Sequence, residues 1–176
     1  MAEGSVSVLV SVGTDKHPFD RLVGWVDRWA AAHPDVSVFV QHGTSDAPRI
    51  AQAAALIPHA DLLDMIAAAD VVISHGGPAT VMDVRACGRR PIVVGRDPER
   101  NEHIDAHQLR FAEHLAKHGL ADLASTEAEL HELIDRGLAD PANSRLDTAS
   151  GASAPGIIAF TKHMNTLLGV PTEATA

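Results

Sequence analysis

The 176-residue chain lacks several features that define common protein classes. Its single cysteine, Cys87, excludes an internal disulfide and suits a reducing compartment, so we expect the cytoplasm. Its 23 acidic residues outnumber 14 lysines and arginines, and the net charge of −9 argues against a nucleic-acid partner, which requires a basic face. Apolar runs are short and interrupted, so we predict neither a membrane span nor a signal segment.

Familiar nucleotide and metal motifs are also missing. The sequence has no GxGxxG fingerprint, no P-loop lysine and no zincin motif. Eleven histidines are present, and we predict that His103, His107, His114 and His118 share one face of a helix over about 102–117. His103 and His107 have metal spacing, but no third ligand is evident, so a His-dependent metallohydrolase is a weak alternative and we expect no metal.

What the sequence does have is a regular alternation of strand-like and helix-like segments. The strand-like segments fall within 5–12, 36–43, 56–57, 69–77, 91–95 and 120–123. The helix-like segments fall within 21–32, 61–70, 78–87, 102–117, 126–138 and 156–168.

This alternation predicts an α/β fold, a Rossmann-like doubly wound parallel sheet covered on both faces. We expect a single domain over residues 1–170 and a flexible tail over 171–176. Ligands of such sheets bind at the carboxyl ends of the strands, here the loops after Val12, Val40, Ile57, Ile73 and Val94.

The loop after Ile73, SHGGPATVMD, has the composition of an anion site. Gly76 and Gly77 allow close backbone approach, and the helix beginning at Pro78 would present free N–H groups at Ala79 and Thr80. Asp83 lies one turn further and would reach a hydroxyl beside the anion. The alternative is a tight turn with a solvated Asp83, and these residues alone do not separate the two.

Two other loops carry weaker signals. Gly13 and Thr14 precede a helix and would form a second backbone cradle, while His17 is a weak candidate for a general base. His107 and Gln108 are more suited to polar contact with a ligand than to metal binding. A solvated, histidine-rich helix face explains the same spacing.

The order of three segments resembles the C-terminal domain of family 28 glycosyltransferases. The segments are VSVGT, AADVVISHGGPATVMDVRACGRRPIVV and EHIDAHQLRFAEHLAKHGLA, with QHG between the first two. By length, the chain is most similar to the catalytic subunits of split, two-component UDP-sugar transferases, such as the dolichol-pathway GlcNAc transferase and bacterial exopolysaccharide enzymes. Asp83 stands where peptidoglycan GlcNAc transferases carry Glu, and Gly95 where many members carry Pro.

The resemblance implies the nucleotide-sugar half of a GT-B enzyme that inverts the sugar and needs no metal or other cofactor. It assigns the turn including His75, Gly76, Gly77, Ala79 and Thr80 to the diphosphate and Asp83 to the ribose. It also assigns His107 and Gln108 to the sugar hydroxyls, the backbone near Ile57 and Pro58 to uracil, and Gly13 and Thr14 to the cleft wall.

The function implied is transfer of a sugar from a UDP-sugar to a polyprenyl-diphosphate-linked or glycan acceptor. We expect a membrane-anchored subunit to bind the acceptor and supply the base, recruiting this chain to the inner face of the membrane through a patch such as Trp25 or the C-terminal helix. The alternative is a nucleotide-sugar-binding module without catalytic activity of its own.

Overall fold

A six-stranded, all-parallel sheet forms the centre of the protein. The computed structural model describes residues 6–146. The strands are β1 Val8–Ser11, β2 Val38–Gln41, β3 Gln52–Ala54, β4 Val71–Ser74, β5 Ile92–Val93 and β6 Asp122–Leu123. Their spatial order is β3-β2-β1-β4-β5-β6, and every pairing is parallel. The prediction of a doubly wound α/β fold is therefore confirmed.

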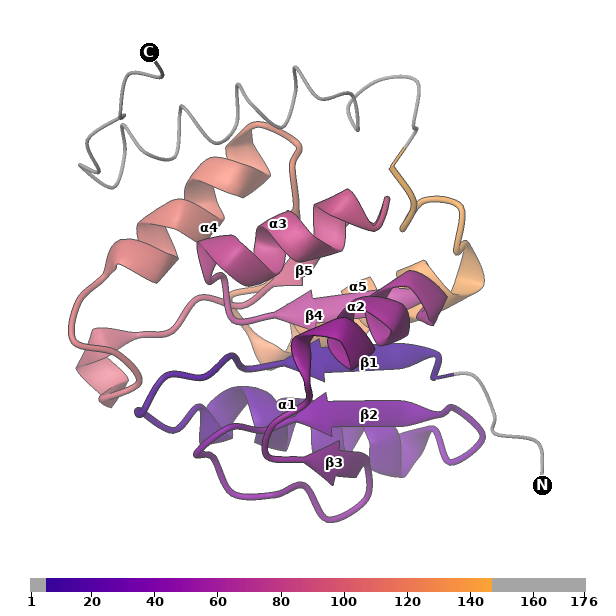
Figure 1. Cartoon of the computed structure of the whole chain (residues 1–176), viewed down its shortest axis with the longest axis horizontal. Coiled ribbons are helices and arrows are strands. Elements are labelled where there is room, and N and C mark those ends of the chain that lie inside the picture. Colours follow the sequence, from indigo (N-terminus) through magenta and orange to yellow (C-terminus); the bar gives the residue numbers. More distant parts are fainter. Residues whose placement is uncertain (1–5, 147–176) are drawn as a thin grey trace.

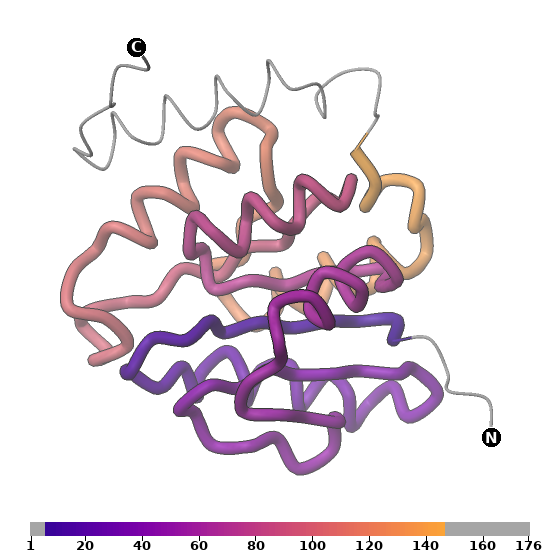
Figure 2. The backbone as a smooth tube through the Cα atoms, in the orientation of Figure 1, coloured from indigo at the N-terminus to yellow at the C-terminus, as the bar shows by residue number. Residues whose placement is uncertain are grey.

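Helices cover both faces of this sheet (Figure 1). They are α1 Asp20–Ala32, α2 His59–Ala68, α3 Pro78–Ala86, α4 His107–Lys117 and α5 Glu127–Ala139, with a 3-10 helix η1 at Pro98–Arg100. The pair α1 and α5 lies behind the sheet, and α2, α3 and α4 lie in front of it (Figures 1 and 2). Two-sided cover explains why the central strands consist almost entirely of buried apolar residues.

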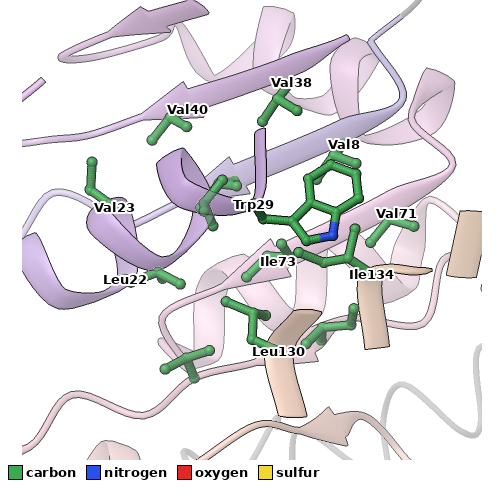
Figure 3. Packing of buried hydrophobic residues seen from close by; sticks show 14 of the residues in the cluster. Val8, Leu22, Val23, Trp29, Val38, Val40, Val71, Ile73, Leu130 and Ile134 are labelled. Carbon is green, nitrogen blue, oxygen red and sulfur yellow. The ribbon is translucent and has the colours of Figure 1, made fainter. Parts of the chain in front are cut away.

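The main core lies between the sheet and the pair α1 and α5. Figure 3 shows Trp29 of α1 packed beside Val8, Val71 and Ile134. Trp29 is 1% exposed, and its indole N–H donates to Asp135 at 2.9 Å, so the polar atom of this large side chain is satisfied. Leu22, Val26 and Trp29 form the buried stripe that their spacing predicts.

Helix boundaries follow recognisable local chemistry. Pro78 occupies the first turn of α3, where its missing N–H costs nothing, and Gly88 just beyond the helix has φ +71°. At α5, Thr126 and Glu129 form a capping box in which each side chain accepts from the other's backbone N–H. These boundaries agree with the sequence expectations.

Two predicted elements are displaced. The short strand expected at residues 56–57 is instead β3 at Gln52–Ala54, and Leu56 is 65% exposed. The displacement has a cause in α1, where the Asp27 carboxylate accepts the backbone N–H groups of residues 49–51 and fixes the approach to β3.

The helix predicted over about 102–117 begins only at His107. Glu102 is held in the preceding loop, since its carboxylate accepts from Arg21 and its carbonyl accepts from Arg96. His103 therefore does not share a helical face with His107, and Ile104, which follows it in the same loop, is 75% exposed.

The helix predicted over 156–168, the tail 171–176 and the end of the predicted domain at residue 170 lie outside the described residues. Within residues 6–146, no helix combines the length and apolarity needed to cross a membrane.

Candidate functional site

A ligand site is expected at the carboxyl ends of β1 and β4, which lie side by side. After β1 the chain continues toward one edge of the sheet, and after β4 it continues toward the other edge. Ser11 and Ser74, the last residues of the two strands, are Cα partners across the sheet. After β1 the chain returns through α1 to β2, whereas after β4 it passes through α3 to β5. In open α/β sheets, ligands bind at the carboxyl ends of the strands at this change of direction. Both predicted glycine loops begin there.

His75 lies between these two loops. Its ring packs so closely against Gly13 and Gly77 that a Cβ at either glycine would overlap it. The side chain is buried, and its Nδ1 lies 3.3 Å from the carbonyl oxygen of Ser11, to which the neutral tautomer donates. Burial, with a smaller contribution from the Arg96 charge, lowers the pKa of His75 to about 4. His75 is thus a neutral spacer that sets the distance between the loops.

The N-terminus of α3 directly follows the glycine loop after β4. Gly77 is its N-cap and Pro78 occupies its first turn, so the N–H groups of Ala79 and Thr80 have no intrahelical partner. Ala79 is exposed and Thr80 is half-buried. The positive end of the helix dipole and these free donors make the turn suitable for an anion, and the assignment of the diphosphate to it stays a prediction.

Asp83 extends this site along α3. Its Oδ2 lies 2.9 Å from Nε2 of His59, the first residue of α2. This contact joins α3 to the segment with Ile57 and Pro58, the residues predicted to meet uracil, since they directly precede α2. The structure therefore brings the predicted base and ribose positions to adjoining helices.

The loop after β1 contains a second polar pair. His17 Nδ1 lies 2.6 Å from Asp15 Oδ1, and His103 Nε2 lies 3.5 Å from Asp15 Oδ2. Although partial burial raises the pKa of Asp15, hydrogen bonds from His17 and the charge of Arg96 outweigh it and lower the pKa below 3.8. Thr14 is exposed beside Gly13, which adopts φ +77°.

Arg96 connects this loop to the loop before α4. It is 1% exposed, and its guanidinium donates to the carbonyl oxygens of Val12 at 2.7 Å, His17 at 2.6 Å and Glu102 at 3.0 Å. A buried cation is stable here because carbonyl acceptors and the nearby Asp15 and Glu102 carboxylates replace its hydration. Arg96 thereby fixes the two loops to each other.

His107 and Gln108 stand at the start of α4, and the structure separates their environments. His107 is exposed and pairs with Asp105 at 2.7 Å. Gln108 lies closer to the glycine turn, since a Cβ on Gly76 would be 3.6 Å from its carbonyl oxygen. Its side-chain Oε1 is buried, and the structure shows no hydrogen-bond partner for it.

Two other kinds of chemistry, metal binding and thiol reactivity, depend on the remaining His, Cys, Asp and Glu side chains. Within residues 6–146, no group of three or more His, Cys, Asp or Glu side chains is arranged to hold a metal ion. Burial raises the pKa of the Cys87 thiol, so this cysteine packs beneath α2 and α3 and is not an activated nucleophile.

Sequence reasoning missed three of the residues that organise the site, namely Asp15, His59 and Arg96. The available signal for Arg96 was its position in the loop after a buried strand, where a charged residue lies at the carboxyl end of the sheet. Nothing in the local sequence links His59 to Asp83, because their contact depends on how α2 and α3 pack.

Residues 7–164 match the model of the glycosyltransferase family 28 C-terminal domain. The chain belongs to this family. Family 28 enzymes are glycosyltransferases, and the crevice between β1 and β4 lies where an open α/β sheet binds its ligand. No curated protein matches the family 28 chain in sequence.

Solved glycosyltransferase structures share its fold. The calicheamicin glycosyltransferase CalG4 has a TM-score of 0.60 and 20% identity, covering 94% of this chain and 44% of CalG4. The glycotransferase of kitacinnamycin has a TM-score of 0.61 and 17% identity, covering 95% of this chain and 41% of that enzyme. MurG of Acinetobacter baumannii has a TM-score of 0.51 and 19% identity, covering 92% of this chain and 51% of MurG.

The family 28 chain thus spans between two fifths and about half of these three proteins. It has the fold of the C-terminal half of a GT-B glycosyltransferase.

Proposed function

We propose that this chain is the donor-binding, catalytic subunit of a two-component inverting glycosyltransferase. It would transfer a sugar from a UDP-sugar to a polyprenyl-diphosphate-linked or glycan acceptor. The observation that carries the proposal is that the two glycine loops, which follow the adjacent strands β1 and β4, meet at His75, and that the second loop leads directly into the N-terminus of α3.

Within this proposal, the α3 N-terminus performs the main chemical task. Departure of the nucleoside diphosphate places negative charge at the crevice, and the N–H groups of Ala79 and Thr80 would stabilise it without reorganisation. Gly76 and Gly77 allow the phosphates to approach the backbone. Pre-oriented backbone donors of this kind make a metal unnecessary for the leaving group.

The remaining assignments place the rest of the donor around this anion site. Asp83 would accept a hydrogen bond from the ribose, and the backbone near Ile57 and Pro58 would meet uracil beyond it. Gln108 would contact the sugar, with His107 at the more exposed side.

The acceptor would be bound outside these 176 residues. One α/β domain provides one wall of a GT-B cleft, so we propose that a membrane-anchored subunit provides the other wall and the base. If the base instead lies in this chain, the candidate is His17, because Asp15 fixes its ring at Nδ1 and leaves Nε2 for the acceptor hydroxyl.

Transfer in the presence of the native host's membranes tests catalysis directly. According to the proposal, these membranes contain both the partner subunit and the acceptor. The purified chain is added to them together with radiolabelled UDP-GlcNAc, UDP-glucose or UDP-glucuronate. We expect one donor to give label in lipid or glycan, and Asp83→Ala to reduce it at least several-fold, with His33→Ala as control.

Label that never exceeds that of membranes alone would contradict the catalytic role. If the chain nevertheless bound a UDP-sugar, the outcome would favour the catalytically silent binding module.

A further inference from the structure

The contact between His59 and Asp83 crosses from α2 to α3, beside the segment that we propose to meet uracil. His59 is the first residue of α2, and Asp83 lies in the second turn of α3. The His59 Nε2 and Asp83 Oδ2 atoms are 2.9 Å apart, a hydrogen-bond distance. The histidine side chain is 68% exposed and the aspartate side chain 28% exposed.

This exposure means that the pair contributes little to folding stability. Solvent-exposed ion pairs are weak because water screens them and ordering two side chains costs entropy. Elsewhere α2 and α3 are joined by apolar packing, including buried Ile66 on α2 and buried Val84 on α3. The geometry of the pair therefore points to a role other than holding the helices together.

A carboxylate has two oxygen atoms, and His59 engages only one of them. Hydrogen bonding through Oδ2 restricts rotation of the Asp83 side chain and leaves Oδ1 in a defined direction. Pre-orientation of a short acidic side chain matters most when it must accept from a small, fixed hydroxyl group. The ribose of a nucleoside diphosphate presents such hydroxyl groups.

We propose that His59 is a specificity-determining positioning residue, which orients Asp83 for recognition of the donor's ribose. The inference rests on the proposed function, because it assumes that Asp83 meets the ribose of UDP. His59 acts through Asp83 and not by contact with the reacting atoms.

Calorimetric titration of the full chain with UDP, 2′-deoxy-UDP and 3′-deoxy-UDP tests this role. The wild type should prefer UDP to at least one deoxy analogue, and Asp83→Ala should remove that preference. His59→Ala should weaken UDP binding about three- to ten-fold while reducing the preference, because an unrestrained Asp83 must be ordered on binding.

Two matched variants separate positioning from general damage. In His59→Gln, the side-chain N–H can still donate to Asp83, so most of the preference should return. In the double variant His59→Ala/Asp83→Ala, loss of His59 should add no further loss of affinity. His33→Ala serves as the control, since His33 is the C-cap of α1 and stacks on Trp29 instead of contacting Asp83.

The outcomes distinguish this inference from the function on which it rests. An undiminished preference for UDP in His59→Ala, or tighter UDP binding, would overturn the positioning role while leaving the Asp83 assignment intact. If the wild type bound UDP but Asp83→Ala kept the full preference, the ribose assignment and the role of His59 would both be wrong. A wild type that did not bind UDP would overturn both as well.

Discussion

At the scale of single residues, the site depends on how closely His75 packs against glycine. Gly13 and Gly77 come from different loops, and both approach the His75 ring more closely than any side chain would permit. The two glycines therefore serve packing within the protein as well as access for a ligand. That second use could not be predicted from the motif, because a sequence does not show which side chain fills the space beside a glycine.

Substitution of Gly77 tests this packing. Gly77 has φ −67°, which alanine adopts without strain, but the new Cβ would overlap His75. We predict that Gly77→Ala lowers the free energy of unfolding by about 1–3 kcal/mol, measured by urea denaturation. In a His75→Ala background, the same change should cost almost nothing because the ring is gone.

Gly88 provides the contrast, since it has φ +71° with open space around its Cβ position. Gly88→Ala should cost about 1 kcal/mol in both backgrounds, owing to backbone conformation alone. An equal cost of Gly77→Ala with and without His75 would show that the packing argument is wrong.

The buried imidazole of His75 also predicts a pH dependence of stability. Its pKa is depressed to about 4 from 6.5, so the unfolded chain binds more protons than the folded chain between these values. The stabilisation is complete above pH 6.5 and is lost as the pH falls toward 4, by roughly 3 kcal/mol in total.

Comparison with His75→Asn isolates this contribution from the other histidines. Between pH 7 and pH 4.5, the free energy of unfolding of the wild type should fall by about 2 kcal/mol more than that of the variant. Parallel pH profiles of the two proteins would contradict the neutral, buried state of His75.

At the scale of elements, local patterns predicted the helices well but failed where a distant side chain fixes the backbone. The stripe of Leu22, Val26 and Trp29 identified α1, and Pro78 with Gly88 bounded α3. By contrast, the start of α4 depends on Arg21 and Arg96 holding residue 102, and no local pattern records these contacts.

The same limit applies to the site. The glycine turn and Asp83 could be singled out because glycine, proline and an acid at fixed spacing have a direct chemical meaning. The position of β3 was misjudged because Leu56 was read as strand-forming although its side chain is exposed. His59 was missed because its partner is 24 residues away on another helix.

At the scale of the whole molecule, the sheet order determines where chemistry can occur. Because β1 and β4 adjoin at the centre, loops that are about sixty residues apart in sequence come together at one end of the sheet, where both contact His75. The alternation of strands and helices predicted the doubly wound parallel sheet, whereas the adjacency of β1 and β4 became known only from the structure. It establishes half of a GT-B architecture, and the proposed partner would complete the cleft.

Calorimetric titration of the wild-type chain with UDP-sugars tests the central claim most directly. UDP, UDP-GlcNAc, UDP-glucose and UDP-glucuronate are compared with GDP, each with and without EDTA. We predict binding that is selective for uridine, unaffected by EDTA and strongest for one sugar. Equal affinity for GDP, loss of binding in EDTA, or no binding of any uridine nucleotide would contradict the account of this crevice as a metal-independent UDP-sugar site.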